Sequence, residues 1–427
     1  MRKTVTRLLM VFAIASQPVS ATELGPRELQ QATHINTMSS ELLRVSLGDG
    51  DLHNTMVSSV SMFYALSMLE LGALEDSQEL LRDLLLTTPG PVTDIAVPLA
   101  DALVVDAGDS DTLGRFALSN SVWASNGATD GRRFVFASDF IDAVSQAFDA
   151  EAHTLDFLAP GAATPVNTWA DAKTHGLIPK IVDDATMQRL TWLIINAAYF
   201  EGAWKTPMYR RGPTEDYRFT TESGERQAVD TVNTKQLLQV ADHEDGAVSL
   251  AIPFSGNRYH LVLQLPPADV EDVGAWLRNT ALPTQAEAVD AAFSGDIYDV
   301  QLRMPVFSYS NRLTLKADTP ATEALGLLPL FTDEANLRAM ADQELSHPVA
   351  RDTKVGLIQQ DTRIELDEKG VKAAAVTMIG GMIKSTSLVI PRPQRQIVVD
   401  RPFAWSIVEG SSRTAIFSGV VATPEED

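Results

Sequence analysis

Residues 367–385 read DEKGVKAAAVTMIGGMIKS, and this segment guides the interpretation of the whole chain. Side chains of a β-strand alternate between two faces, so a period of two divides the segment into two sets. The uncharged, mostly small set is Val371, Ala373, Ala375, Thr377, Ile379, Gly381 and Ile383. The other set carries both lysines, Lys372 and Lys384. The segment therefore fits a sheet that buries one of its faces.

The same segment also has the composition of a loop. Gly370, Gly380 and Gly381 lose much backbone entropy in a strand, and alanine has a low strand propensity. A sequence that prefers a loop but matches a buried strand favours two alternative states. A short helix over residues 372–378 and a flexible linker are the other interpretations.

Composition limits the classes of function. The chain has 427 residues, 45% of them hydrophobic, and no cysteine, so it can bury a large core without disulfides. Its 56 acidic against 34 basic residues give a net charge of −22. This charge argues against nucleic acid and against a membrane surface as partners. Length alone allows two or three domains.

The first 21 residues have the pattern of a secretory signal. Arg2, Lys3 and Arg7 form a basic start, an apolar run follows, and small residues up to Ala21 suit a cleavage site. Removal of these three cations makes the mature chain still more acidic. We expect a secreted protein, in a periplasm or outside the cell. An N-terminal core helix is the alternative.

Hydrophobic periodicity predicts a helix-rich first half and a strand-rich second half. Helices are predicted over residues 29–45, 62–74, 77–86, 134–148, 167–174 and 313–325. Strands are predicted over residues 116–124, 191–198, 237–241, 248–254, 259–265, 300–307, 357–366, 397–399, 403–408 and 415–421. The segregation indicates an α+β fold.

No motif for catalysis is present. The seven histidines show no metal-ligand spacing, and H-E-x-x-H, G-x-S-x-G and the phosphate-binding loop G-x-x-x-x-G-K-[ST] are absent from the sequence. We therefore expect no metal, no cofactor and no enzyme. A secreted hydrolase with a triad built from distant residues is the alternative that the sequence leaves open.

The stretch from Glu368 to Thr377 resembles the reactive-loop hinge of the serpins, a family of suicide protease inhibitors. Further motifs of this family follow in order between residues 28 and 424. They are matched by Asn54, Ser58-Ser59-Val60-Ser61, Asn120-Ser121-Val122-Trp123, Asn167, Trp169, Asn196-Ala197-Ala198-Tyr199-Phe200-Glu201-Gly202-Ala203-Trp204, Arg401-Pro402-Phe403 and Ile416-Phe417-Ser418-Gly419.

The resemblance implies one α+β domain over residues 22–427, with about nine helices around three β-sheets and a reactive loop over about residues 368–391. A target serine protease would attack this loop and form an acyl-enzyme. The cut loop would insert as a new strand of the largest sheet and trap the protease. The implied hinge residues are Glu368, Gly370, Val371, Ala373, Ala374, Ala375 and Thr377.

The position of the cleaved bond follows from family spacing. Counting from Glu368 places it between Lys384 and Ser385, and Lys384 suits a trypsin-like protease. The segment from Lys384 to Pro402 exceeds the common family length, so counting back from Pro402 shifts the bond toward residues 388–390. We expect a monomer whose partner is the target protease.

The resemblance also implies a polar cluster that holds the sheet closed until insertion. Its members here would be Ser58, Ser61, Asn196 and Gln360, with Trp204 at the point where the loop enters. Gln360 replaces a histidine that is usual in the family, and Lys372 replaces an acid. The alternative function is a non-inhibitory serpin with a chaperone, carrier or storage role, whose loop is cut without trapping.

Overall fold

The computed structural model describes residues 25–87, 90–104, 114–351, 354–371 and 392–425. The predicted export signal over residues 1–21 lies outside the described residues. So do four hinge residues, Ala373, Ala374, Ala375 and Thr377, and the bond between Lys384 and Ser385.

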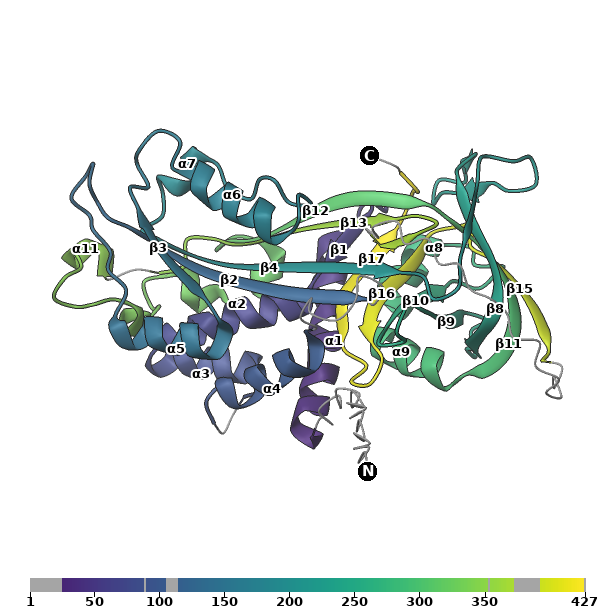
Figure 1. Ribbon diagram of the computed structural model, residues 1–427, viewed down its shortest axis with the longest axis horizontal. Coiled ribbons are helices and arrows are strands. Elements are labelled where there is room, and N and C mark those ends of the chain that lie inside the picture. Colours follow the sequence, from purple (N-terminus) through teal and green to yellow (C-terminus); the bar gives the residue numbers. More distant parts are fainter. Residues whose placement is uncertain (1–24, 88–89, 105–113, 352–353, 372–391, 426–427) are drawn as a thin grey trace, which may run out of the picture.

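The described chain forms three β-sheets with helices around them, as an α+β fold requires (Figure 1). The first sheet has nine strands in the order β1-β17-β16-β10-β9-β8-β11-β15, with β5 paired to β8. The second has six strands in the order β12-β13-β14-β4-β2-β3, and the third is the pair β6 and β7. Figure 1 shows the six-stranded sheet between α6 on one side and α2 to α5 on the other.

The strands are β1 (Thr55–Val57), β2 (Arg115–Ser125), β3 (Glu151–Leu155), β4 (Trp192–Ala203), β5 (Tyr209–Arg211), β6 (Phe219–Thr220), β7 (Arg226–Gln227), β8 (Thr231–Asp242), β9 (Val248–Pro253), β10 (Tyr259–Leu265), β11 (Asp296–Pro305), β12 (Phe307–Leu315), β13 (Ile358–Leu366), β14 (Gly370–Val371), β15 (Gln394–Val398), β16 (Phe403–Glu409) and β17 (Ala415–Val421). The α-helices are α1 (Pro26–Leu47), α2 (Ser59–Gly72), α3 (Glu75–Leu84), α4 (Thr93–Leu103), α5 (Ser138–Phe148), α6 (Ala163–Lys173), α7 (Asp184–Met187), α8 (Val273–Trp276), α9 (Gln285–Ser294), α10 (Pro320–Ala324) and α11 (Pro348–Arg351).

Eleven α-helical segments occur in the described residues where about nine helices were predicted, and three of them, α7, α8 and α11, are only four residues long. The predicted first helix is confirmed as α1, which ends at Gly48 with a φ of 58°. Gly48 adopts this left-handed conformation without the penalty that a side chain would bring. The serine-rich start of α2 is a helix cap, because the Ser58 hydroxyl accepts from the backbone N–H of Ser61.

The predicted helix over residues 313–325 is wrong for most of its length. Residues up to Leu315 belong to β12, in which Phe307, Tyr309, Leu313 and Leu315 are buried and the side chains between them are partly or fully exposed. Helix α10 begins only at Pro320. Alternate burial of Leu313 and Leu315 is the period of a strand, which a short apolar run does not distinguish from a helix. The helix predicted from residue 134 begins at Ser138 instead, because the backbone N–H of Phe134 bonds to Ser125 in β2.

Strand β4 is covered on both faces, as its continuous apolar sequence predicted. Trp192 and Phe200 belong to the main core on the α2 side. Ile195 and Ala197 pack with Trp169 of α6 in a second, smaller core. Within the described residues no helix is both long and apolar enough to span a membrane.

The buried side chain of His260 makes the stability of the fold depend on pH. It packs against the Phe293 ring at 4.8 Å, and burial, together with the charges of Arg413 and Lys205, lowers its pKa to about 4. The unfolded chain binds this proton near pH 6.5. Above pH 6.5 His260 is neutral in both the folded and the unfolded chain, and the free energy of unfolding has its full value. As the pH falls from 6.5 toward 4, only the unfolded chain binds the proton, so the free energy of unfolding decreases.

We expect this one group to remove about 2 kcal/mol of stability between pH 7 and pH 5. Urea unfolding of the wild type and of His260→Gln at both pH values measures it, since the variant should lose less stability on acidification. His53→Gln, at an exposed position, is the control. Equal pH dependence in the wild type and His260→Gln would contradict the assignment.

Candidate functional site

The described part of the predicted hinge is a tight turn that leads β13 back into the sheet as β14. The Asp367 carboxylate accepts from the backbone N–H groups of Lys369, at 2.7 Å, and Gly370, at 3.3 Å. Val371 then pairs with Leu366 of β13 and with Gly202 of β4. Val371 is buried, with 4% of its surface exposed. The chain therefore enters the sheet between β13 and β4 at this point.

Gly370 is required by this close approach. Its φ is 140°, and a Cβ atom at this position would lie 1.9 Å from the carbonyl oxygen of Gly202. Any side chain would therefore push β14 away from β4. Two residues earlier, the Glu368 carboxylate lies 3.9 Å from the Arg210 guanidinium of β5.

Trp204 anchors the turn to the end of β4. Its indole N–H donates to the carbonyl of Asp367 at 2.9 Å, and its backbone N–H donates to Lys369 at 3.1 Å. The ring stacks on Phe254 with an interplanar angle of 12°. Trp204 thus lies where the chain enters the sheet, and it holds the turn in place.

Beyond β14 the neighbouring strands β4 and β13 separate. Within the described residues no ladder joins β4 to β13 directly, and β14 alone links them. A cavity of about 360 Å³ lies in this gap. Its lining includes Met62, Leu66 and Leu69 of α2, Ile181 after α6, and Trp192 and Ile194 of β4. The facing edges of the two strands offer backbone groups to a further strand.

Gln360 fixes β13 to the start of α2. Its side-chain oxygen accepts from the backbone N–H of Ser58 at 2.9 Å, and its amide donates to the Ser58 carbonyl at 2.7 Å. Ser58 is fully buried, and its hydroxyl donates to Ile416 of β17. Three members of the predicted cluster, Ser58, Ser61 and Gln360, therefore lie together.

Asn196 lies on the opposite side of the gap. Its amide donates to the Asn120 side chain of β2 at 2.7 Å, and Asn120 donates to the carbonyl of Phe148. The Asn196 side-chain oxygen has no hydrogen-bond partner among the described residues. The cavity thus separates the polar cluster into two halves, and Asn120 belongs to one of them. Asn120 belongs to a family motif in the sequence, but the motif alone gives this residue no role.

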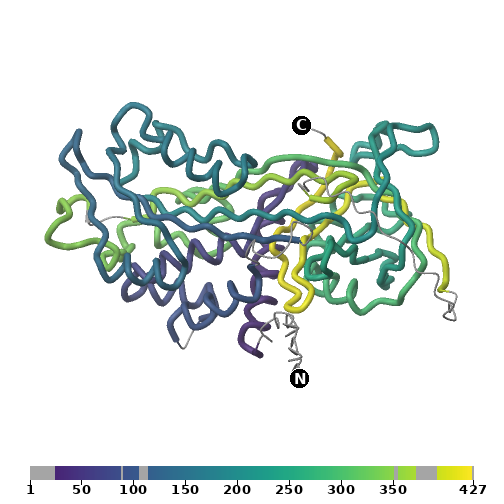
Figure 2. The backbone as a smooth tube through the Cα atoms, in the orientation of Figure 1, coloured from purple at the N-terminus to yellow at the C-terminus, as the bar shows by residue number. Residues whose placement is uncertain are grey.

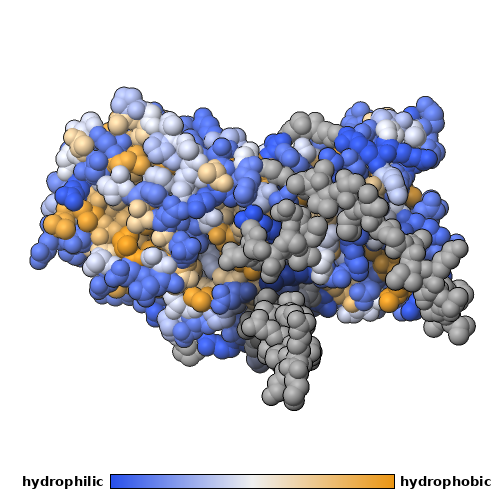
Figure 3. All heavy atoms as spheres, in the orientation of Figure 1, coloured by the Kyte–Doolittle hydropathy of each residue, from blue (hydrophilic) through white to orange (hydrophobic). Residues whose placement is uncertain are grey.

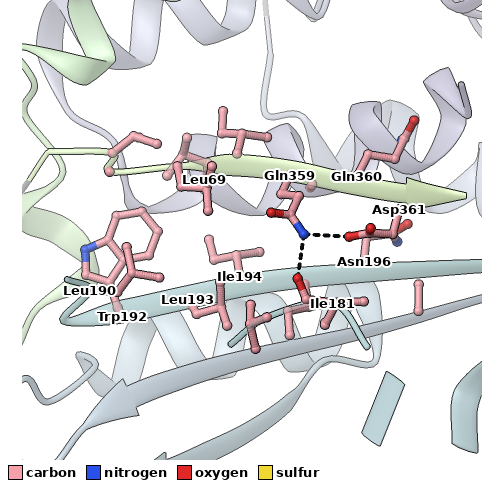
Figure 4. A pocket seen from close by; sticks show the side chains of 18 of the residues that line it. Leu69, Ile181, Leu190, Trp192, Leu193, Ile194, Asn196, Gln359, Gln360 and Asp361 are labelled. Atoms are coloured by element: carbon pink, nitrogen blue, oxygen red, sulfur yellow. Dashed lines mark hydrogen bonds between the residues drawn. The ribbon is translucent and has the colours of Figure 1, made fainter. Parts of the chain in front are cut away.

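In the described structure, hydrogen bonds from Gln359 and Arg312 reach from the β13 side of the gap to the segment that follows α6. Gln359 of β13 donates to the carbonyl of Ile181 at 2.5 Å and to the Asp361 carboxylate at 2.6 Å (Figure 4). Burial raises the pKa of Asp361, although Arg312, at 2.6 Å, lowers it in part. Sequence reasoning missed Gln359 and Arg312, because no motif marks a polar side chain that bonds to a distant backbone carbonyl.

We expect Gln360→Ala to destabilise the protein by about 2 kcal/mol, because the backbone N–H of Ser58 is left buried without an acceptor. Urea unfolding measures the change. Gln301→Ala, an exposed glutamine in β11, is the matched control and should change stability by less than about 0.5 kcal/mol. Similar effects of the two substitutions would show that Gln360 is not an anchor.

The described fold is thus defined by a nine-stranded and a six-stranded sheet, with the short strand β14 paired between β13 and β4. The profile of the family described as "Serpin (serine protease inhibitor)" matches residues 33–424. The chain belongs to the serpin family.

Relatives and solved structures agree with this assignment. Iripin-8 of Ixodes ricinus is 25% identical over 97% of this chain and 99% of its own length. Mouse neuroserpin is 26% identical over 88% of each chain. The native structure of tengpin, a thermophilic serpin, covers 95% of this chain and 97% of its own with a TM-score of 0.73 and 22% identity. A thyroxine-binding globulin in complex with thyroxine covers 93% of this chain and 100% of its own, with a TM-score of 0.73 and 18% identity.

Proposed function

We propose that this chain is a secreted inhibitor of serine proteases that acts by suicide-substrate trapping. The observation that carries the proposal is the gap between β4 and β13. At the end of this gap beside Leu366 and Gly202, the strand β14 (Gly370–Val371) already lies between the two strands. The reactive loop, which continues directly from Val371, would fill this gap after cleavage. About 14 inserted residues at roughly 3.3 Å each would carry the attached protease about 45 Å.

The register of β14 supports this motion when it is continued along the gap. Val371 lies opposite Leu366 and Gly202. Further insertion in the same register would bring Ala375 opposite Thr362 and Ala198. The side chains of Leu366 and Thr362 face the buried side of the sheet. The uncharged set of the loop would thus face the core, and its lysines would face away.

The same register would place Thr377 between the two halves of the polar cluster. It would lie opposite Gln360 on β13 and Asn196 on β4. A threonine hydroxyl can donate to the Asn196 oxygen, which has no partner among the described residues. Insertion would therefore satisfy a buried acceptor, which favours the inserted state.

We propose Lys384–Ser385 as the cleaved bond and a trypsin-like protease as the target. A bond near residues 388–390 would instead select a protease that prefers apolar residues. Export by residues 1–21, a monomeric state and a periplasmic or extracellular location complete the proposal. A chain without cysteine needs no oxidising compartment for its fold.

The test mixes the mature protein with trypsin, elastase and subtilisin in separate reactions, followed by denaturing gel electrophoresis. We expect a covalent complex with trypsin that survives denaturation. Mass spectrometry should show that the released C-terminal peptide begins at Ser385. Cleavage without complex formation by all three proteases would overturn inhibition and favour the non-inhibitory alternative.

A further inference from the structure

Three of the large apolar side chains that are exposed in the described structure lie on one face of the nine-stranded sheet. They are Tyr209 of β5, Leu237 of β8 and Ile297 of β11, with 72%, 59% and 39% of their surface exposed. The registers place them together: Tyr209 pairs with Asn233, Leu237 lies four residues further along β8, and Ile297 pairs with Gln239. Residues an even number apart share a face of a strand. We call this the outer face of β5, β8 and β11.

Between its three apolar residues the outer face carries few charges, in a chain of net charge −22. Arg211 of β5 and Arg303 of β11 share this face at its edge beside Tyr209 and Asn233, and Arg303 forms an ion pair with Asp216 at 2.9 Å. The side chains that share it between the three apolar residues are Asn233, Lys235, Gln239, Asp299 and Gln301. The only charges among them, Lys235 and Asp299, form an ion pair at 3.0 Å. Depletion of charge together with exposed aromatic and aliphatic groups is typical of the core of a protein–protein interface.

Both attachment points of the reactive loop border this face. At one end Arg210, next to Tyr209, lies 3.9 Å from Glu368 at the base of the hinge. At the other end the chain returns from the loop as β15, whose Gln394 pairs with Asp299, the residue opposite Leu237. Only residues 372–393 connect Val371 to β15, so a protease that holds a bond in this segment is tethered beside the outer face. Figures 1 and 2 show β8, β11 and β15 together at the right end of the molecule.

We propose that the outer face of β5, β8 and β11 is a second contact surface for the target protease, through Tyr209, Leu237 and Ile297. The occupant is the protease that holds the loop, and it would present an uncharged, partly apolar surface beside its own active-site cleft. The inference rests on the proposed function for the identity of the partner. Its effect is on recognition of the protease before any bond is cleaved, and not on insertion of the loop.

The test uses trypsin, elastase and subtilisin whose catalytic serine is replaced by alanine, so that binding is measured without cleavage or trapping. The triple variant Tyr209→Thr, Leu237→Thr and Ile297→Thr keeps residues suited to strands. It should bind about tenfold more weakly than the wild type to whichever of the three proteases binds most tightly. A synthetic peptide of residues 372–391 should bind that protease as weakly as the triple variant or more so.

The matched control replaces exposed apolar residues at the other end of the molecule. Leu345→Thr with Val349→Thr alters side chains that are 57% and 63% exposed near α11, which lies at the left end of Figure 1. Figure 3 shows apolar groups exposed at both ends. This control should bind like the wild type. Urea unfolding of both variants should match the wild type, which excludes misfolding.

Three outcomes would overturn the inference. These are equal binding by the triple variant and the wild type, an equal loss in the control variant, or a wild-type dimer in solution that the triple variant abolishes. The last result would assign the face to a second copy of this chain. Failure of the proposed function is separate, because it is read from the absence of a covalent complex with active protease, whereas binding to the inactive protease is measured in either case.

Discussion

Cleavage at Lys384 is expected to raise the melting temperature of the mature protein by about 10 °C or more. In the proposed mechanism the cut loop would continue β14 along the gap and would supply backbone partners to the edges of β4 and β13. About ten new hydrogen bonds at about 1 kcal/mol each would add about 10 kcal/mol. For a chain of this length, each kcal/mol shifts the melting temperature by about 1 °C.

Calorimetry of the intact and the nicked protein, after removal of the protease, measures this difference. The nicked form of Ala375→Arg is the control, because a charge on the inward face should prevent most of the gain. A nicked wild-type protein that melts at or below the temperature of the intact form would remove the energy source from the proposed mechanism.

If the chain inhibits as proposed, Ala375→Arg is expected to convert it from an inhibitor into a substrate. Continued register would place this side chain opposite Thr362, which is 5% exposed, and toward the core. Burial of an unpaired guanidinium costs several kcal/mol, and about 3 kcal/mol in the barrier to insertion slows that step about a hundredfold. Hydrolysis of the acyl-enzyme would then outpace insertion, and the covalent complex should disappear from the gel.

Ala374→Arg is the matched control, since the same charge on the neighbouring residue would face away from the core. The stoichiometry of inhibition, measured by titrating trypsin, should stay near the wild-type value for this variant and rise at least about tenfold for Ala375→Arg. Equal values for the two variants would refute the assignment of faces in the loop.

Much of the fold could be predicted from the sequence, because local signals and family motifs agreed. Gly48 ends α1, and Ser58 caps α2, as helix signals indicate. Strands β10 and β17 have the predicted boundaries, since each is a buried apolar run between turn residues. Strand β12 was partly mistaken for a helix, because a strand that alternates over few residues carries little periodic signal.

The candidate site was predicted less completely, because its geometry depends on contacts between distant residues. The sequence located Gln360 and Asn196 but could not show that a cavity separates them. Nor could it show that Gln360 bonds to the backbone of Ser58, more than 300 positions away. The partner of Asn196 is Asn120, an amide–amide pair that periodicity cannot predict.

The cavity beside α2 has a consequence for engineering. Larger side chains at Ala65 or Ala197, which both line it, would improve packing in the uncut molecule and slow its denaturation. In the proposed mechanism the same substitutions would occupy space that the inserted loop requires, and they would reduce the difference in free energy between the intact and the cleaved protein. At these positions a higher melting temperature of the intact protein should therefore be accompanied by weaker protease inhibition. A screen that selects only for heat resistance would yield stable variants that no longer inhibit.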